Sequence, residues 1–146
     1  MPKIALRIFK ATSFIGDLMF RAGLKVQGRP LLRLGTVGAR SGKQRRSVLG
    51  WFPDEGRDDA WIVVASNAGG ARHPAWAYNL VKRPDSTTVD AGEGEVPVSV
   101  EMLTGAERDR VWRRIADAAP GYGRYEEKTD REIPLFRLTP GPDDAR

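Results

Sequence analysis

The beginning of the chain repeats apolar side chains at the spacing of an α-helix. Over residues 3–25 the apolar positions recur every three or four residues, and the basic positions collect on the opposite side. This periodicity predicts an amphipathic helix. Two interpretations stay open: a helix that contacts an anionic membrane surface, and a helix packed across the domain with its charges in solvent. The apolar positions are Ile4, Ile8, Ala11, Ile15, Leu18, Met19 and Ala22.

From residue 31 the pattern changes to the period of two that strands show. Residues 31–37 and 47–52 predict two strands, joined by a turn at 38–46 that is rich in glycine and charge. Residues 53–59 are polar and predict a second turn. The continuous apolar run at 61–66 is typical of a strand buried on both faces.

The second half of the chain predicts a few helices inserted between strands. Pro97 is expected to place part of its strand at an edge or a bulge, and Thr104 with Glu107 has the spacing of a capping box. Because short turns join most strands, we expect an antiparallel sheet closed into a small barrel. The expected elements are a Gly-rich loop at 67–72, a helix between Pro74 and Pro84, strands at 87–91 and 95–103, a helix from Thr104 to about Ala119, an aromatic segment at 122–128 and a strand at 133–138.

Length and composition narrow the chemistry. With 146 residues the chain has the size of one domain, and we divide it into a helical region at 1–28, a barrel at 29–140 and a tail at 141–146. It contains no cysteine, which excludes disulfides, thiolate nucleophiles and Cys-ligated metals. A Ser-His-Asp triad could only use the single histidine, His73.

The net charge of +5 hides an uneven distribution. Residues 1–50 carry eleven Lys/Arg and one acid, whereas the rest of the chain carries thirteen basic and eighteen acidic residues. Arginine dominates the basic residues, which favours bidentate recognition of phosphate or carboxylate. The partner classes that follow are nucleic acid, an anionic membrane surface and a polyanionic small molecule. No apolar stretch approaches the roughly 20 residues of a membrane span, and we expect a cytoplasmic protein.

The turn at 38–46 holds the densest charge. It differs from a phosphate-binding P-loop, because Val37 and Gln44 stand where that loop needs a glycine and a hydroxyl, and because it joins two strands. Its glycines still permit backbone N–H groups to converge on an anion, although a solvated hairpin turn explains it equally. The turn contains no aromatic residue, which argues against a nucleic-acid site.

Two further segments carry candidate chemistry. Residues 65–76 lead from a buried strand through a hydroxyl, an amide and two glycines into a helix, and strand ends of this kind often bind ligands. Within this segment His73 is expected to be a loop or helix-capping residue. Tyr122 and Tyr125 either form an aromatic lid over a planar ligand or pack in a short helical turn. Arg131 is expected to pair with its acidic neighbours on the surface.

Three segments in this order resemble the deazaflavin-dependent nitroreductase family. They are Gly38–Arg45 (G-x-R-S-G-x-x-R), Ala65–Pro84 (A-S-N-x-G-G-x-x-x-H-P-x-W-x-x-N-L-x-x-x-P) and Pro120–Pro134 (P-x-Y-x-x-Y-x-x-x-T-x-R-x-I-P). The resemblance implies an α+β, mainly β fold, the split β-barrel of flavin reductases and pyridoxamine-phosphate oxidases. It also implies the cofactor coenzyme F-420, an 8-hydroxy-5-deazaflavin with a phosphate and an oligoglutamate tail; FMN is the lesser alternative.

The resemblance implies roles for particular residues. The phosphate and the nearby tail are expected at Ala39, Arg40, Ser41, Gly42, Lys43, Gln44 and Arg45. The ring is expected near Leu49, Gly50, Trp51, Val64, Ala65, Ser66, Asn67 and Tyr122. Tyr122, Tyr125, Ser66 and Trp76 match positions on the substrate side. The chain departs from the family at Arg40, where Lys is usual, and at Asn67 and Ala119, where some members carry Lys and Tyr.

The implied activity is hydride transfer from the reduced cofactor to an electron-poor acceptor such as a quinone or a nitro compound, with the cofactor carrying the chemistry. The alternatives are an FMN-binding reductase on the same barrel and a non-catalytic membrane-surface protein. No nucleic-acid partner is expected. Peripheral membrane contact through residues 3–25, at the inner face of the cell membrane, and a homodimer remain open.

Overall fold

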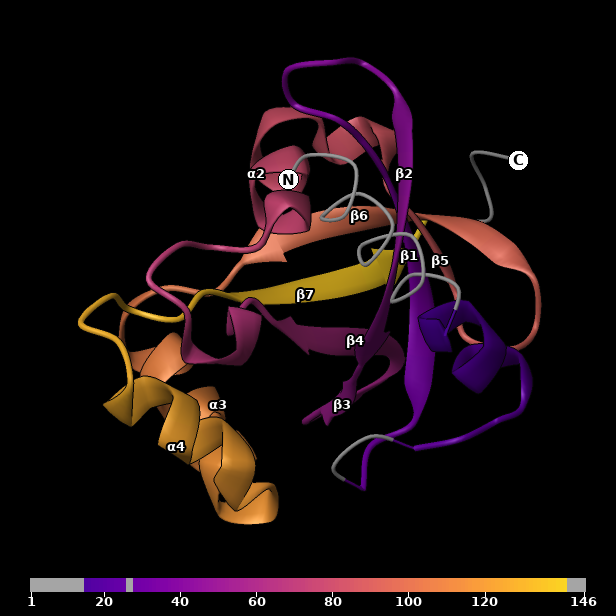
Figure 1. The fold of residues 1–146 in the computed structure, drawn as a ribbon. Coiled ribbons are helices and arrows are strands. Elements are labelled where there is room, and N and C mark those ends of the chain that lie inside the picture. The colour runs from indigo at the N-terminus through magenta and orange to yellow at the C-terminus, as the bar shows by residue number, and fades with distance from the viewer. Residues whose placement is uncertain (1–14, 26–27, 142–146) are drawn as a thin grey trace.

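The computed structural model describes residues 15–25 and 28–141. Its centre is a seven-stranded antiparallel sheet with the order β2-β1-β5-β6-β7-β4-β3 (Figure 1). The predicted mainly β, split-barrel architecture is confirmed. The strands are β1 (Leu31–Val37), β2 (Gln44–Gly50), β3 (Phe52–Asp54), β4 (Arg57–Val64), β5 (Thr88–Asp90), β6 (Glu95–Met102) and β7 (Leu135–Pro140).

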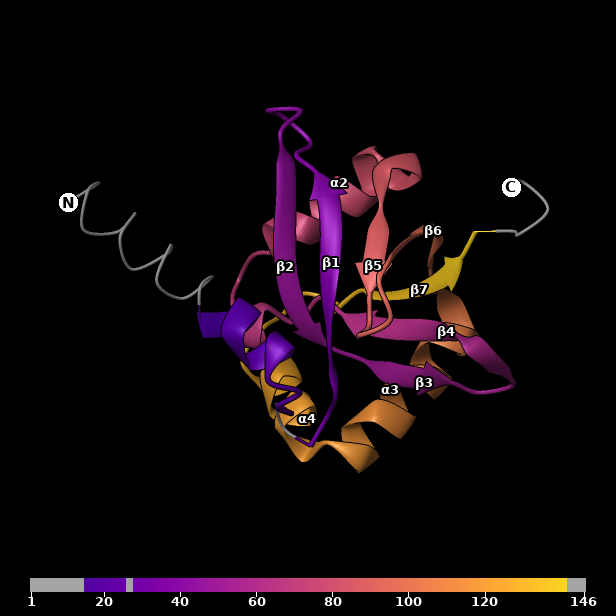
Figure 2. The ribbon, with the colours of Figure 1, turned by 90° about the vertical axis from the view of Figure 1, so that its right-hand side faces the viewer.

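The barrel is split at β6, which belongs to both halves of the sheet. Residues 95–97 pair with β5, and residues 98–102 pair with β7. Figure 2 shows the result: β1, β2 and β5 run across the direction of β3, β4 and β7. Pro97 is expected to place part of its strand at an edge or a bulge, and residues 95–97 do pair with β5 alone. Pro97 is the last residue paired with β5 before the partner strand changes.

Two apolar cores lie on opposite faces of β4, and alternation along the strand explains them. Val63 and Ala65 join the core that includes Trp76 of helix α2 (Ala75–Lys82). Ile62 and Val64 join the core beneath helices α3 (Gly105–Ala118) and α4 (Pro120–Glu127). Because both faces are covered, this strand reads as a continuous apolar run in the sequence.

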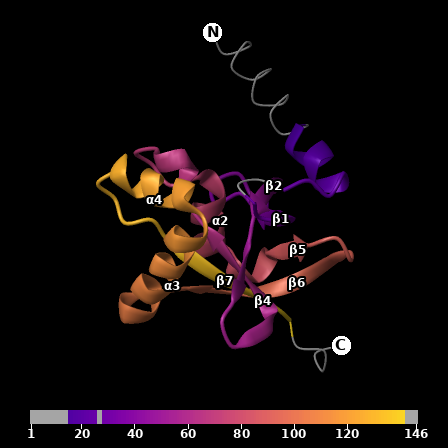
Figure 3. The same cartoon turned by 90° about the horizontal axis from the view of Figure 1, so that it is seen from below.

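The helices lie where the prolines and glycines of the sequence predict helix ends, but the N-terminal cap of α3 differs from the prediction. Figure 3 shows α3 and α4 side by side on one flank of the sheet. Thr104 is the N-cap residue of α3, but its side chain makes no capping hydrogen bond. The predicted capping box is therefore wrong, because the Glu107 carboxylate bonds Arg137 instead. Short 3-10 turns, η1 (Asn67–Gly69) and η2 (Pro84–Ser86), flank α2.

The helix predicted for residues 3–25 ends earlier in the chain than expected. Residues 15–21 are helical, and the helix stops before Gly23, which has φ of 70°. The Gly23 N–H donates to the Phe20 carbonyl and the Leu24 N–H to the Met19 carbonyl, which closes the helix. Residues 3–14 of the predicted helix lie outside the described ranges. The helix rests on the barrel through Asp17, which pairs with Arg33, while Ile15 and Leu18 are exposed. Within the described ranges, no helix is long and apolar enough to cross a bilayer.

The strand boundaries after β1 differ from the prediction. β2 begins at Gln44 within the expected turn, and the expected polar turn at 53–59 shrinks to two residues between β3 and β4. The misassigned residues of β2 are exposed because β2 is an edge strand. Exposed edge positions carry no apolar alternation, so their strand character is hidden in the sequence.

Candidate functional site

The basic turn forms the tip of the β1–β2 hairpin, which projects beyond the rest of the sheet (Figure 1). The Gly38 N–H donates to the Lys43 carbonyl at 2.8 Å, and the Gly42 N–H donates to the Gly38 carbonyl at 3.0 Å. The Ser41 hydroxyl oxygen accepts a bond from the Lys43 N–H at 3.1 Å. Gly42 has φ of 71°, a conformation that favours glycine. The backbone of the turn is therefore closed on itself.

Two residues fix the position of this turn: Asn79 of α2, and Arg83, the C-cap residue of the same helix. The Asn79 Oδ1 accepts a bond of 2.8 Å from the Ala39 N–H, and its Nδ2 donates to the Thr36 hydroxyl at 3.1 Å. The Arg83 Nε donates to the Gly38 carbonyl at 3.3 Å. Sequence reasoning did not assign Asn79 or Arg83 to the site. Asn79 stands in the second family-like segment, which is the signal that could have found it.

The cationic side chains of the hairpin tip take no part in this anchoring. Arg40, Lys43, Arg45 and Arg46 are exposed. Within residues 15–25 and 28–141, no carboxylate forms an ion pair with any of the four. Their charge is therefore available to an anionic ligand.

Three of the predicted ring-binding residues, Leu49 to Trp51, lie at the other end of β2. Six residue steps separate Gln44 from Gly50, a distance of about 20 Å along an extended strand. At this end a Cβ added to Gly50 would lie 3.5 Å from the Tyr122 hydroxyl. Because Gly50 has no side chain, its backbone lies open toward the Tyr122 hydroxyl.

Tyr122 and Tyr125 of α4 form an aromatic group beside Gly50. Their ring centroids are 5.5 Å apart, and the Tyr122 ring meets the Phe52 ring edge-on at 5.4 Å. Tyr122 is buried, and that burial, followed by the influence of Tyr125, raises the pKa of its phenol above the usual value of 10.0. The Tyr122 hydroxyl therefore stays protonated near neutral pH and can donate a hydrogen bond.

Helix α4 also packs on the loop that follows β4. A Cβ at Gly69 would lie 3.1 Å from the Tyr125 carbonyl oxygen. In the same loop Asn67 has a positive φ of 48°, and its Nδ2 donates to the Arg72 carbonyl at 3.0 Å. The amide of Asn67 is therefore used within the loop. The contacts therefore tie Gly50 to Tyr122, and the loop after β4 to α4 through Gly69.

Arg131 does not pair with acidic neighbours on the surface, and that expectation is wrong. Its guanidinium donates to three backbone carbonyls of the loop after β4 and to the His73 Nδ1. Arginine cannot accept, so His73 accepts through Nδ1 and carries its proton on Nε2. Burial first, and then the Arg131 charge, lower the pKa of His73 below 6.5. His73 is thus a loop residue, as expected, with a defined partner.

Trp76, which the resemblance implies for the substrate side, belongs to the core that α2 covers. Its indole is buried and meets the Phe136 ring at a centroid distance of 6.1 Å. A separate cavity of about 790 Å³ lies at the far end of β4, between the β3–β4 and β5–β6 hairpins, and shares only Trp51 with the predicted site.

Comparison with known proteins identifies a family to which this chain is similar. A profile described as "F420H(2)-dependent quinone reductase" matches residues 10–140. Two reductases of Mycobacterium tuberculosis (strain H37Rv) with this description are similar in sequence. One is 32% identical over 82% of this chain and 80% of its own length, and the other is 35% identical over 76% of this chain and 90% of its own length.

Solved structures agree. A structure titled as an F420-H2 dependent reductase (FDR-A) is 35% identical, covers 75% of this chain and 94% of its own, and has a TM-score of 0.64. A relative titled as a domain-swapped dimer is 32% identical over 94% of this chain and 99% of its own, with a TM-score of 0.64. A pyridoxamine 5'-phosphate oxidase-like protein of Listeria innocua, 9% identical over 88% of this chain and 94% of its own with a TM-score of 0.51, shares the fold. The chain belongs to the F420H(2)-dependent quinone reductase family.

Proposed function

We propose that the chain binds reduced coenzyme F-420 along β2 and reduces a quinone. The observation that carries this proposal is the separation of charge and ring site. Four cations without an ion pair among the described residues stand at one end of β2, and the glycine-tyrosine group stands about 20 Å away at the other. A ligand that fills both ends needs anionic groups well beyond a planar ring. The oligoglutamate tail of coenzyme F-420 meets this need, whereas the single phosphate of FMN stays close to its ring.

The residues present fit this cofactor. Arg40, Lys43 and Arg45 would hold the phosphate and tail carboxylates, with the turn backbone held in place by Asn79. Leu49 to Trp51 and the end of β4 would hold the ring. When bound in its reduced form, the deazaflavin supplies a hydride.

The hydroxyl groups of the site suit the acceptor side. A quinone that takes up a hydride needs one proton to become a quinol. Tyr122 keeps its proton near neutral pH, because burial raises the pKa of its phenol, and it can orient a quinone oxygen. Ser66 and Tyr125 are the other candidates for this role. If Tyr125→Phe leaves turnover unchanged and Tyr122→Phe lowers it, Tyr125 has no proton role. Quinone and nitro compounds compared in one assay identify the preferred acceptor.

The central experiment is a fluorescence titration of the full chain with oxidised coenzyme F-420 and, separately, with FMN. We expect saturable binding of coenzyme F-420 and much weaker binding of FMN. Tight FMN binding with none for coenzyme F-420 would overturn the proposal and favour an FMN reductase on this barrel. Anaerobic mixing of the reduced cofactor with a short-chain quinone then measures turnover directly.

We further propose that the helix at residues 15–21 contacts a membrane, where quinones are found. Ile15 and Leu18 are exposed on this helix and Leu24 is exposed just after it, while Arg21 and Lys25 lie nearby. Pelleting with anionic vesicles should be salt-dependent and should be lost in a chain lacking residues 1–28. Equal pelleting of the two chains would reject this contact and leave the reductase proposal unaffected. Activity on a water-soluble quinone serves as the control.

The relative titled as a domain-swapped dimer supports a homodimer for this chain. Light scattering on the purified full chain tests this directly. A mass of one chain across a hundredfold range of concentration would contradict it.

A further inference from the structure

The guanidinium of Arg131 organises the loop that follows β4. Its Nε donates to the Gly70 carbonyl at 3.0 Å, one terminal nitrogen donates to the Ser66 carbonyl at 2.7 Å, and the other donates to the Ala65 carbonyl at 3.1 Å. This last nitrogen also lies 2.8 Å from the His73 Nδ1. One side chain thus fixes both ends of the loop and three of its peptide groups.

Two of these peptide groups are consecutive and are oriented together. Ser66 has φ of −75° and ψ of −32°, a conformation that places successive carbonyls nearly parallel. In a planar trans peptide the N–H points opposite to the C=O. Because the Ala65 and Ser66 carbonyls face Arg131, the N–H groups of Ser66 and Asn67 face away from it. Neither N–H meets a backbone acceptor in the part of the chain that the structure describes.

We propose that Arg131 is a positioning residue for the cofactor ring, because it aims the N–H groups of Ser66 and Asn67 at a carbonyl edge of the deazaflavin. The proposal rests on the proposed function, since it assumes that the ring lies at the end of β4. The pyrimidine part of a deazaflavin presents carbonyl oxygens at its edge, and two parallel N–H donors match one such oxygen. Arg131 acts only through the loop and touches no reacting atom.

The planar fork of arginine is what this arrangement requires. Lysine presents a single ammonium group with three N–H donors, which cannot hold three carbonyls and a histidine nitrogen in one plane. His73 completes the arrangement as a neutral acceptor, consistent with its lowered pKa. Contact between Gly69 and α4 further ties the loop to the tyrosine side of the site.

The test separates the ring end of the site from the tail end by using two ligands. Oxidised coenzyme F-420 engages both ends, whereas the deazaflavin without its phosphate and oligoglutamate tail engages only the ring end. Both are titrated by fluorescence against the full chain, Arg131→Gln, Arg131→Lys and the double variant Arg40→Ala/Arg45→Ala. Arg114→Gln is the matched control, because it removes an arginine bond of 3.0 Å to a different backbone carbonyl, that of Pro53.

We expect Arg131→Gln to weaken both ligands by about tenfold, as loss of charge-assisted hydrogen bonds predicts. Arg131→Lys should give a similar loss, because its charge remains but the fork does not. The double variant should weaken coenzyme F-420 and leave the tailless deazaflavin within about twofold. Arg114→Gln should change neither. A merely structural role for Arg131 would lower thermal stability and leave the affinity of the tailless deazaflavin within about twofold of that of the wild-type chain.

Amide NMR on the wild-type chain gives a readout that needs neither turnover nor a variant. Addition of the tailless deazaflavin should shift the Ser66 and Asn67 amide protons downfield, as expected when an N–H gains an acceptor. Absence of these shifts in a saturated sample would overturn the donor assignment. Unchanged affinity of the tailless ligand in folded Arg131→Lys would overturn the role of Arg131. Failure of the wild-type chain to bind coenzyme F-420 would instead reject the proposed function itself.

Discussion

The side-chain amide of Asn79 joins α2 to the hairpin that carries the basic turn: its Oδ1 accepts the Ala39 N–H at 2.8 Å while its Nδ2 donates to the Thr36 hydroxyl at 3.1 Å. Asn79 is 6% exposed, and its bond to Thr36 is buried while its bond to Ala39 is partly buried. A helix on one side of the sheet thereby fixes the position of a turn that extends beyond the sheet.

Replacing Asn79 should move the turn. We expect Asn79→Leu to weaken coenzyme F-420 by about tenfold and to lower the free energy of unfolding by about 1–3 kcal/mol, since it leaves a backbone N–H without its acceptor. Thr36→Val is the matched variant, because it removes only the second bond. It should lower stability with little change in affinity. Titration and urea unfolding measure the two effects, and equal affinity losses in both variants would contradict this division.

The cations of the hairpin tip should control affinity without affecting stability. Arg40→Ala/Arg45→Ala should weaken coenzyme F-420 about tenfold to a hundredfold, on the order of 1 kcal/mol or slightly more for each exposed charge. The dependence of affinity on salt should become shallower, because fewer charges contact the ligand. Arg57→Ala, an exposed arginine on β4, is the control and should bind like the wild-type chain. The melting temperature should stay the same in all three proteins.

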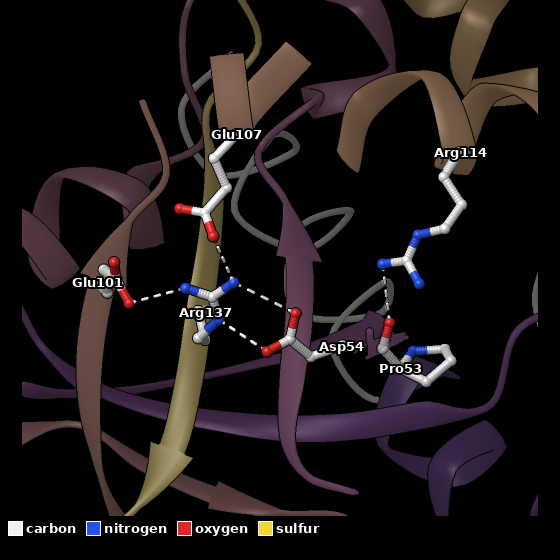
Figure 4. A network of polar contacts seen from close by, with 6 residues as sticks. All are labelled: Pro53, Asp54, Glu101, Glu107, Arg114 and Arg137. Atoms are coloured by element: carbon white, nitrogen blue, oxygen red, sulfur yellow. Dashed lines mark hydrogen bonds and ion pairs between the residues drawn. The ribbon is translucent and has the colours of Figure 1, made fainter. Parts of the chain in front are cut away.

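Arg137 should contribute to stability and not to binding. Its guanidinium bonds Asp54 at 2.7 and 3.2 Å, Glu101 at 2.9 Å and Glu107 at 3.0 Å (Figure 4). The hydrogen bond to Asp54 is the main cause of the raised pKa of Arg137, which therefore stays charged. Asp54 has a side chain only 2% exposed, and removing its partner leaves an uncompensated buried charge.

Arg137→Met should accordingly lower the free energy of unfolding by about 3–5 kcal/mol. Asp54→Asn in that background should recover part of the loss, since the unpaired charge is gone. Arg21→Ala, which removes an exposed ion pair with Asp17, should cost less than about 1 kcal/mol. Chemical unfolding of these four proteins and of the Asp54→Asn single variant gives the comparison. Additive effects of the changes at Arg137 and Asp54 would argue against their coupling.

Stability should fall in mild acid because of His73. Its pKa is lowered in the folded chain, so the unfolded chain binds more protons once the pH drops below the ordinary value of 6.5. Folding therefore becomes less favourable as pH decreases from about 7 toward 5. His73→Gln keeps an acceptor for Arg131 but does not titrate, and its melting temperature should depend less on pH over this window. Parallel curves for both proteins would exclude His73 as the cause.

The sequence predicted the elements whose pattern reflects burial. β1 matched at both ends, and the apolar run at 61–66 was assigned to a strand covered on both faces, as β4 is. An error arose where a tertiary partner overrides a local pattern. Glu107 bonds Arg137 of a distant strand in place of Thr104. That partner is not visible from neighbouring residues.

For the candidate site, too, the sequence assigned some residues and missed others. Motif resemblance assigned the cofactor tail to the turn and the ring to the end of β4 and the α4 tyrosines, and these assignments stay predictions. It gave no role to Asn79, Arg83 or Arg131, although all three stand within the quoted segments. Their bonds run to residues 40 to 66 positions away in the chain, so only the folded structure reveals what they hold.

The independence of anchor and charge at the hairpin tip has an evolutionary consequence. Asn79, Arg83 and the turn's own backbone bonds fix its shape, while the four cationic side chains stabilise nothing in the described fold. Substitutions at these positions can therefore accumulate without a penalty in folding. A lineage could adapt to tails of different length or charge by exchanging a few surface side chains, and a laboratory library limited to them would explore ligand preference on an intact scaffold.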